Sequence, residues 1–84
     1  GESGYSYIID RSGLVLQHIK KEKILKENLG DTDNKELKAI VEKMKNGETS
    51  EGFYTYDGVY KFVRFQPVGN WVVAITANYD EYMA

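Results

Sequence analysis

The chain has 84 residues, of which 42% are hydrophobic and 13% aromatic, and a formal net charge of -2 at pH 7. This length suits one domain, so we expect residues 1–84 to fold around a single core. Thirteen acidic and eleven basic side chains give no broad positive field, which argues against a nucleic-acid partner. The lack of cysteine excludes disulfides and thiolate metal sites, and no apolar run reaches the roughly 20 residues of a membrane-spanning helix.

A first hairpin is predicted from β-forming residues on either side of a turn. Residues 5–10 form one strand, which ends at Asp10-Arg11-Ser12-Gly13. Asp with Gly three residues later suits a type I turn or a short bulged loop. A second strand is expected over residues 14–19. Because both strands carry apolar residues at neighbouring positions, we expect this part of the sheet to be buried on both faces.

The following segment, residues 20–27, is rich in charges and indicates a solvated loop or helix face. Its apolar residues are expected to anchor it to the body of the domain, together with one leucine just beyond it: Ile24, Leu25 and Leu29. Residues 30–32 then form a loop that leads into a helix.

The clearest helix covers residues 33–46. Asp33 followed by Glu36 resembles a capping box, and Gly47 supplies a stop. Apolar residues recur at helical spacing, at Leu37, Ile40, Val41 and Met44. This stripe is narrow, so the helix should lie on a sheet and leave its charged side in water: Lys35, Lys38, Glu42, Lys43 and Lys45.

Residues 52–77 predict three consecutive antiparallel strands. Asp57-Gly58 lies between two alternating runs rich in aromatic and β-branched residues, which is a strong hairpin signal. Gly69-Asn70 marks a second turn. Residues 78–84 carry acidic side chains where a helix would begin, and we expect a first helical turn there.

Two-residue loops at both turns assign every side chain of these strands to a face. One face holds Tyr54, Tyr56, Lys61, Val63, Phe65, Val72, Ala74 and Thr76. The other face holds Phe53, Thr55, Tyr60, Phe62, Arg64, Trp71, Val73 and Ile75. One helix covers one face, so the second face needs loops, a further segment or another subunit, such as a second copy in a homodimer.

No set of residues predicts catalysis or metal binding. His18 is the only histidine, and no cysteine accompanies it. Ser6, Ser12 and Asp10 supply the residue types of a triad without a nucleophile-elbow signature, and the eight glycines form no phosphate loop. Asp31 and Asp33 lack the glycine and terminal glutamate of a calcium loop. We therefore expect no enzyme, no metal and no cofactor.

The candidate binding residues are those of the first sheet face that combine aromatic rings with one charge. They are Tyr54, Tyr56, Lys61 and Phe65, extended by Tyr7 from the first strand. Tyrosine hydroxyls and a lysine among apolar groups suit a pocket for a small carboxylate or amine-bearing ligand. The alternative is structural: Lys61 extends to solvent from a sheet edge, and the tyrosines are core residues with hydroxyls at the rim.

The order of these motifs resembles the Cache family of PAS-like extracytoplasmic sensor domains. The matching pieces cover essentially the whole chain. They are Gly4-Tyr5-x-Tyr7-Ile8-Ile9-Asp10-x-x-Gly13, His18, Asn28-Leu29-Gly30, Met44-x-x-Gly47, Gly52-x-Tyr54-x-Tyr56 with Gly58, Phe65-x-Pro67-Val68, Trp71 and Ile75-Thr76-Ala77.

The resemblance implies an α+β fold: a five-stranded antiparallel sheet of order 2-1-5-4-3 with one main helix and loops on one face. It also implies a module between transmembrane helices of a chemoreceptor, sensor kinase or diguanylate cyclase, outside the cytoplasm, that binds an amino acid or organic acid. The chain starts where the membrane-proximal module of a double Cache domain would start, a module that relays ligand-induced shifts; a truncated single Cache domain is the other form. A cytoplasmic PAS-like interaction domain without a small ligand stays open as an alternative.

Overall fold

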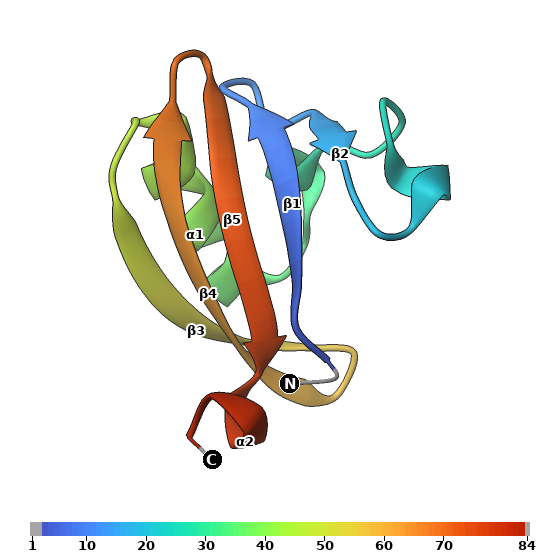
Figure 1. Ribbon diagram of the computed structural model, residues 1–84, viewed down its shortest axis with the longest axis vertical. Helices are drawn as coiled ribbons and strands as arrows, with labels where there is room; N and C mark the ends of the chain where they lie inside the picture. The colour runs from blue at the N-terminus through green and yellow to red at the C-terminus, as the bar shows by residue number, and fades with distance from the viewer. Residues whose placement is uncertain (1–2, 84) are drawn as a thin grey trace.

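A five-stranded antiparallel sheet forms the body of the molecule, and its strand order is β2-β1-β5-β4-β3 (Figure 1). The computed structural model describes residues 3–83. The strands are β1 Tyr5–Asp10, β2 Val15–Gln17, β3 Ser50–Tyr56, β4 Val59–Val68 and β5 Trp71–Asn78. With the main helix α1, Lys35–Lys45, this is the α+β architecture and strand order expected from the sequence.

Both predicted hairpin turns in the second half of the chain are confirmed. Tyr56 pairs with Val59 and Val68 pairs with Trp71, so each loop has two residues. Asp57 and Gly58 have φ values of 53° and 78°, the left-handed conformations that a type I′ turn requires at both central positions. The predicted division of β3, β4 and β5 into two faces follows from this register and is right.

The first hairpin differs from the prediction in the length of its second strand. The turn is as expected, since Gly13 N donates to Asp10 O at 3.0 Å. However, β2 covers only three residues, and its pairing with β1 is interrupted by a register shift between Ile8 and Ile9. The outer edge of β2 pairs with a loop, since Val15 N donates to Glu27 O and Leu25 N donates to Val15 O. Burial on both faces is also not observed within residues 3–83, where Ser6 is exposed.

Helix α1 begins one residue later than the capping box suggested. The cap is Asn34, whose side-chain oxygen accepts from Leu37 N at 3.0 Å, and not Asp33. Glu36 bonds across to the sheet instead of back to the cap, because its Oε1 accepts from Thr55 N at 2.9 Å. The four apolar residues of the predicted stripe are all buried, and they hold the helix against the sheet.

Between β2 and α1, residues 18–34 form a layer of loop beside the helix. It contains two short 3-10 helices, η1 Lys21–Lys23 and η2 Leu29–Asp31, the second at the place where only a loop was predicted. Leu29 packs on the core as expected. Leu25 does not, because its backbone has a φ of 61° that turns the side chain outward, where it is 65% exposed.

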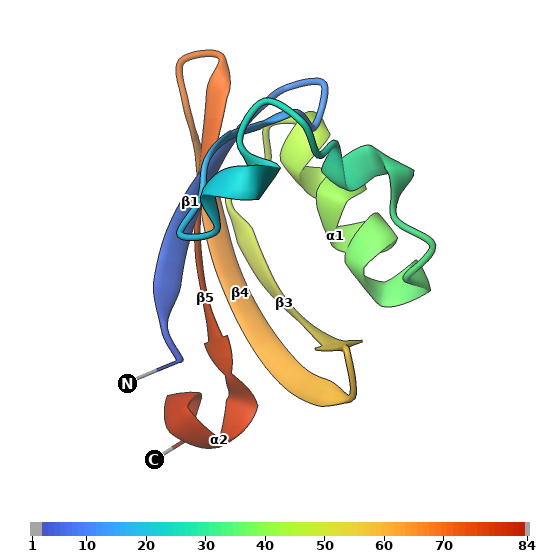
Figure 2. The same cartoon turned by 90° about the vertical axis from the view of Figure 1, so that its right-hand side faces the viewer.

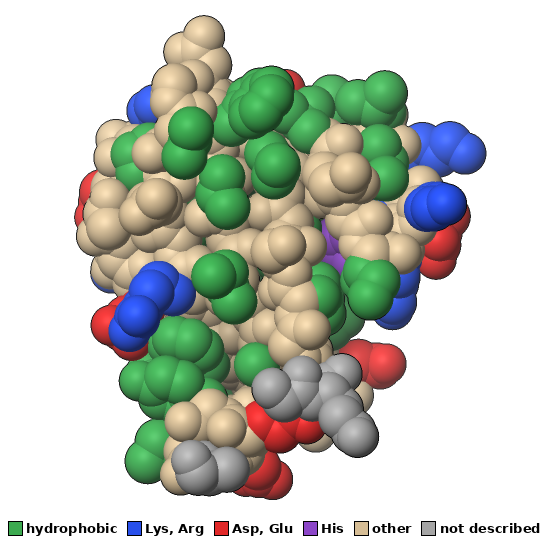
Figure 3. Space-filling model, viewed as in Figure 1, with side chains coloured by type: hydrophobic (Ala, Val, Ile, Leu, Met, Phe, Trp, Pro, Cys, Tyr) green, Lys and Arg blue, Asp and Glu red, His purple; other side chains and the backbone are tan. Residues whose placement is uncertain are grey.

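The sheet therefore has a covered inner face and an open outer face (Figure 2). The core cluster lies between the inner face and the helix. The sheet supplies Tyr7, Ile9, Val15, Tyr54, Val63, Phe65, Val72 and Ala74, and α1 supplies Leu37, Ile40, Val41 and Met44. The outer face exposes large side chains, among them Phe53, Tyr60, Val68, Trp71 and Ile75. Figure 3 views this face and shows several hydrophobic groups on it, with backbone and other side chains between many of them.

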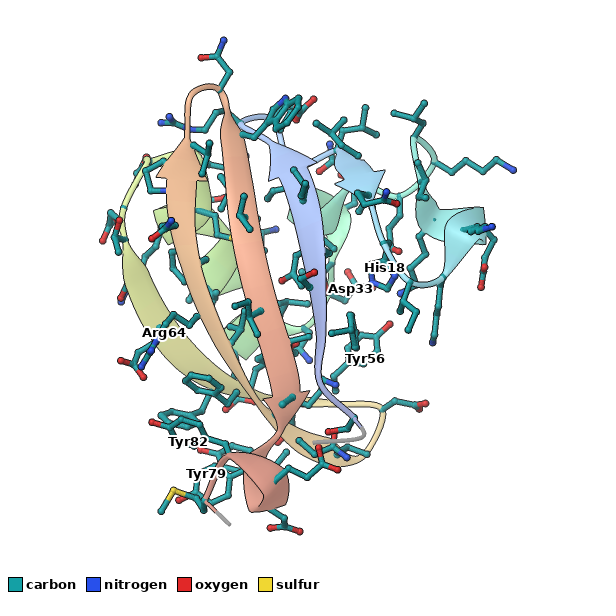
Figure 4. All side chains as sticks on the ribbon, viewed as in Figure 1. His18, Asp33, Tyr56, Arg64, Tyr79 and Tyr82 are labelled. Atoms are coloured by element: carbon teal, nitrogen blue, oxygen red, sulfur yellow. The ribbon has the colours of Figure 1, made fainter. Side chains whose placement is uncertain are left out.

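The short helix α2, Tyr79–Tyr82, covers one end of the outer face, as the acidic tail predicted. The ring of Tyr82 stacks on Phe62 with centroids 4.0 Å apart, and Tyr79 meets Phe53 and Tyr60 edge-on or tilted at 5.6 and 5.1 Å. Figure 4 shows Tyr79 and Tyr82 at this end of the molecule. We call Phe53, Tyr60, Phe62, Tyr79 and Tyr82 the outer aromatic cluster.

Candidate ligand-binding cavity

A partly open cavity of about 330 Å³ lies between the inner face of the sheet, the loop layer and the start of α1. Its wall on the sheet side comes from three strands: Tyr5 and Tyr7 of β1, Tyr54 and Tyr56 of β3, and Lys61 of β4. The loop layer and α1 supply the remaining lining residues, which are His18, Lys23, Lys26, Glu27, Asn28, Leu29, Asp31, Thr32 and Leu37. His18 and Tyr56 lie on the same side of β1 in Figure 4.

Four of the five residues predicted for a pocket line this cavity. Tyr7, Tyr54, Tyr56 and Lys61 are among its walls. Phe65 is not: it is only 1% exposed and belongs to the core. It shares the inner face with Lys61, but four residues along a strand is about 13 Å at the usual rise per residue. The prediction of Phe65 as a pocket residue is therefore not supported by its position.

Lys61 is the buried charge of the cavity. It lies on β4, which is flanked by β5 and β3, so the alternative of a lysine at a sheet edge is wrong. The residue is only 9% exposed, and burial lowers the pKa of its ammonium, with the nearby Lys20 adding to the effect and Glu81 opposing it. Its Nζ lies 5.3 Å from the centroid of the Tyr5 ring, a cation–π geometry.

The hydroxyl of Tyr54 belongs to a chain of buried hydrogen bonds. Thr76 Oγ1 donates to Phe62 O at 2.8 Å, so its one proton is used, and the Tyr54 hydroxyl must be the donor in its 3.1 Å contact with Thr76 Oγ1. Burial raises the pKa of Tyr54 although the bond to Thr76 opposes this. The hydroxyl that borders the cavity is thus neutral and has only acceptor capacity left.

His18 closes the cavity next to β1, with its ring 5.2 Å from Tyr5 and 5.8 Å from Tyr7 between centroids. Its Nδ1 accepts a hydrogen bond from Lys20 N at 2.9 Å, so the neutral ring carries its proton on Nε2. Burial and the charge of Lys23 lower the pKa of His18. The imidazole is therefore a neutral donor at Nε2.

An ion pair stands at the mouth of the cavity. Lys23 Nζ lies 3.3 Å from Glu27 Oε2, one helical turn further on, and 5.7 Å from the centroid of the half-exposed Tyr56 ring. Burial pulls the pKa of Lys23 down, but the bond and charge of Glu27 outweigh this and raise it. Lys23 therefore stays charged, and its ammonium is paired with the Glu27 carboxylate.

The sequence missed two kinds of lining residue. Tyr5 lies two residues before Tyr7, so strand alternation alone would have placed it on the same face. Lys23 and Glu27 were assigned to a solvated segment, although their i, i+4 spacing is that of an ion pair. His18 was weighed as a metal ligand and as a triad member, but not as a residue of the binding cavity. Its contact with Tyr5 depends on the path of the loop layer, which no short-range pattern reveals.

Two kinds of chemistry were considered from the sequence, metal binding and a catalytic triad. Within residues 3–83 no three His, Asp or Glu side chains converge as a metal site would need. Ser12 donates from its backbone N and hydroxyl to Asp10 Oδ1, at 2.8 and 2.6 Å, which is a turn interaction. Asp10 thus holds the first hairpin turn.

Within residues 3–83 no helix is long and apolar enough to cross a bilayer.

Comparison with solved structures places this architecture among receptor domains. The extracellular domain of the histidine kinase mmHK1S-Z2 superposes with a TM-score of 0.86 and 22% identity, over 96% of this chain and 33% of that one. The chain has the fold of an extracellular sensor domain. The Cache-like resemblance inferred from the sequence is thereby confirmed at the level of fold.

Two chemoreceptor domains share the Cache-like fold. The periplasmic sensory domain of Campylobacter jejuni Tlp1 matches with a TM-score of 0.74 and 23% identity, over 95% of this chain and 30% of that one. The ligand-binding domain of Pseudomonas aeruginosa PctB in complex with L-Arg matches with a TM-score of 0.71 and 21% identity, over 100% and 32%. The chain thus spans about one third of the length of these domains. No family model and no curated protein sequence matches the chain.

Proposed function

We propose that the chain is a non-catalytic, extracytoplasmic sensor module of a membrane-anchored signal-transduction receptor, and that its cavity binds a small carboxylate-bearing metabolite. The fold of chemoreceptor and sensor-kinase domains supports the receptor role. The binding role rests on one observation, the buried Lys61 ammonium among tyrosines at the wall of a cavity of about 330 Å³. A volume near the lower end of the usual range suits a metabolite better than a peptide.

A thermal-shift screen of amino acids and organic acids tests the binding role. A ligand that binds only the folded chain raises the melting temperature by mass action. Lys61→Ala should abolish that rise, whereas Lys38→Ala, at an exposed lysine of α1 outside the lining, should keep it. A screen without hits, or hits that survive in Lys61→Ala, would contradict the proposed site.

A second candidate function is the relay of movement from a neighbouring module, and it rests on the contacts between the two ends of the described chain. Ser3 donates from its backbone N at 3.0 Å and from its hydroxyl to the Glu81 carboxylate, and Asn78 N donates to Ser3 Oγ at 2.9 Å. A displacement of residue 3 would therefore move α2. Crosslinking of the full-length receptor at α2 with and without stimulus would show no difference if this role is wrong.

The open outer face favours the alternative of an interaction domain without a small ligand. Trp71, for example, is 51% exposed on that face. In this role the chain would associate in solution through the outer face, and Trp71→Ser would weaken the association while no metabolite shifts the melting temperature. A monomeric chain with a bound metabolite would exclude it.

A further inference from the structure

The charged side chains that line the cavity differ in whether they have an ion-pair partner among the described residues. Among the described residues, the lining holds three lysines (Lys23, Lys26 and Lys61) and two acids (Glu27 and Asp31). Glu27 is paired with Lys23 at 3.3 Å, while Lys26 and Asp31 are exposed to water. The one charge that is both buried and without an ion-pair partner in residues 3–83 is therefore the ammonium of Lys61.

The Lys61 ammonium is not fully enclosed by the described residues. No fully enclosed side-chain nitrogen or oxygen in residues 3–83 lacks a hydrogen-bond partner. Lys61 Nζ has no such partner in the described chain, so it cannot be fully enclosed, and the cavity is the space that the residue lines. Glu81, whose charge acts on Lys61, binds Ser3 with both of its carboxylate oxygens.

The neutral side chains near Lys61 also suit a ligand with an anionic head and an apolar body. His18 carries its proton on Nε2 and is a donor, because its Nδ1 accepts from Lys20 N. The rings of Tyr5, Tyr7 and His18 lie within 6.4 Å of one another between centroids and give an aromatic wall. Such a site offers a cation and a donor to an anionic head, and aromatic rings to an apolar body.

An α-amino acid also brings an ammonium, which needs an anion or several acceptors once it leaves water. The Tyr54 hydroxyl has acceptor capacity, but Glu27, the less exposed of the two carboxylates of the lining, is already paired with Lys23. The ammonium of an amino acid would enter a site whose uncompensated charge is positive, so it would be repelled and not bound.

We propose that the cavity selects small carboxylic acids that lack an α-ammonium group, with Lys61 as the carboxylate-binding residue and the Lys23–Glu27 pair as the element that excludes amino acids. This inference rests on the proposed binding function. It sets the chain apart from PctB, which was solved with L-Arg.

Isothermal titration of the chain at neutral pH with matched pairs tests the selectivity. The pairs are propionate against L-alanine and 3-phenylpropionate against L-phenylalanine, which differ only by the ammonium. We expect the acid without nitrogen to bind at least about tenfold more tightly in one or both pairs, because an unpaired buried polar group is rejected strongly. Equal or tighter binding of the amino acids would overturn the inference and leave the binding function standing. Failure of all four to bind would overturn the binding function and the inference with it.

Variants of the ion pair sharpen the test. Lys23→Met frees the Glu27 carboxylate to accept an ammonium, so the preference for the acid without nitrogen should fall several-fold or reverse. The matched control Lys38→Met, at an exposed lysine of α1 that does not line the cavity, should keep the preference. Lys61→Arg retains the charge and should retain binding, while Lys61→Met should lose it. An unchanged preference in folded Lys23→Met would remove the ion pair from the explanation.

Discussion

The inner and outer faces of the sheet are made by the same strands and carry similar numbers of large apolar side chains, yet they behave differently. On the inner face, α1 and the loop layer cover Val63 and Phe65, which are buried. A buried hydrogen bond on the same face joins Tyr54 to Thr76. On the outer face, Phe53 and Trp71 stay 38% and 51% exposed, and only α2 covers one end. Alternation along a strand therefore assigns side chains to a face without saying which face is covered.

The largest expected effect comes from a pair of phenylalanines on opposite faces. Phe65→Ala should cost about 3–5 kcal/mol of unfolding free energy, because it leaves a cavity in a packed core. Phe53→Ala loses only partly buried contacts in the outer aromatic cluster and should cost about 1–2 kcal/mol. Urea unfolding monitored by circular dichroism measures both, and Phe65→Leu serves if the alanine variant does not fold. Equal costs would mean that the outer face is also packed in solution.

A second comparison concerns threonines. Thr76→Val on the inner face removes the acceptor of Tyr54 and the donor to Phe62 O, so it should cost about 1–3 kcal/mol. Thr55→Val on the outer face changes an exposed side chain and should stay within about 0.5 kcal/mol. Thermal and urea unfolding of the two variants should separate clearly, and a Thr76→Val domain as stable as the parent would refute the buried network.

A third test concerns the N-cap of α1, the helix that covers the inner face. Asn34→Ala removes the bond to Leu37 N and the bond that the same side chain donates to Thr55 O, so we expect a loss of about 1–2 kcal/mol. Asp33→Ala should change the unfolding free energy by less than about 0.5 kcal/mol, because Asp33 is an exposed residue outside the helix. The reverse order would restore Asp33 as the cap.

The smallest effect is a dependence of stability on pH that arises from His18, which lines the cavity under the inner face. Burial lowers the pKa of His18 below its ordinary value of 6.5, so below that pH the unfolded chain binds more protons than the folded one. The stabilising contribution of the neutral ring is full above pH 6.5 and is lost as pH falls through the pKa of the folded state. A proton NMR titration should give a midpoint below 6.5, and His18→Gln should flatten stability in this range. A midpoint at or above 6.5 would contradict the described contacts.

Much of the fold could be predicted because strand register is a local property. Asp57-Gly58 specifies a two-residue turn, and once Tyr56 faces Val59 the period of two assigns the rest. The helix cap was displaced by one residue because both Asp33 and Asn34 are good caps, and the choice is made by the distant Thr55 O. Local rules offer no way to choose between two such neighbours.

The cavity was only half predictable for the same reason. Strand alternation predicts Tyr54, Tyr56 and Lys61 as lining residues. It also led to Phe65 as a pocket residue, because one face of a ten-residue strand is long enough to hold both a cavity and the core, where Phe65 lies. His18, Lys23 and Glu27 reach the cavity through the loop layer, whose path is fixed by backbone pairing with Val15. That pairing, and the outward turn of Leu25, have no signature in the pattern of apolar residues.

The contact between Ser3 and Glu81 has a mechanical consequence. Residue 3 precedes β1, and residue 78 ends β5. The strands β1 and β5 are antiparallel neighbours, and Tyr5 pairs with Thr76 at this end of the ladder. Tension applied across the two ends would load the ladder at one end only, so the strands would separate one pair at a time, as a zipper opens, instead of resisting together in shear. The first bonds to yield would be those of Ser3. The pair Tyr5–Thr76 would follow, and both of its residues touch the groups that form the cavity wall.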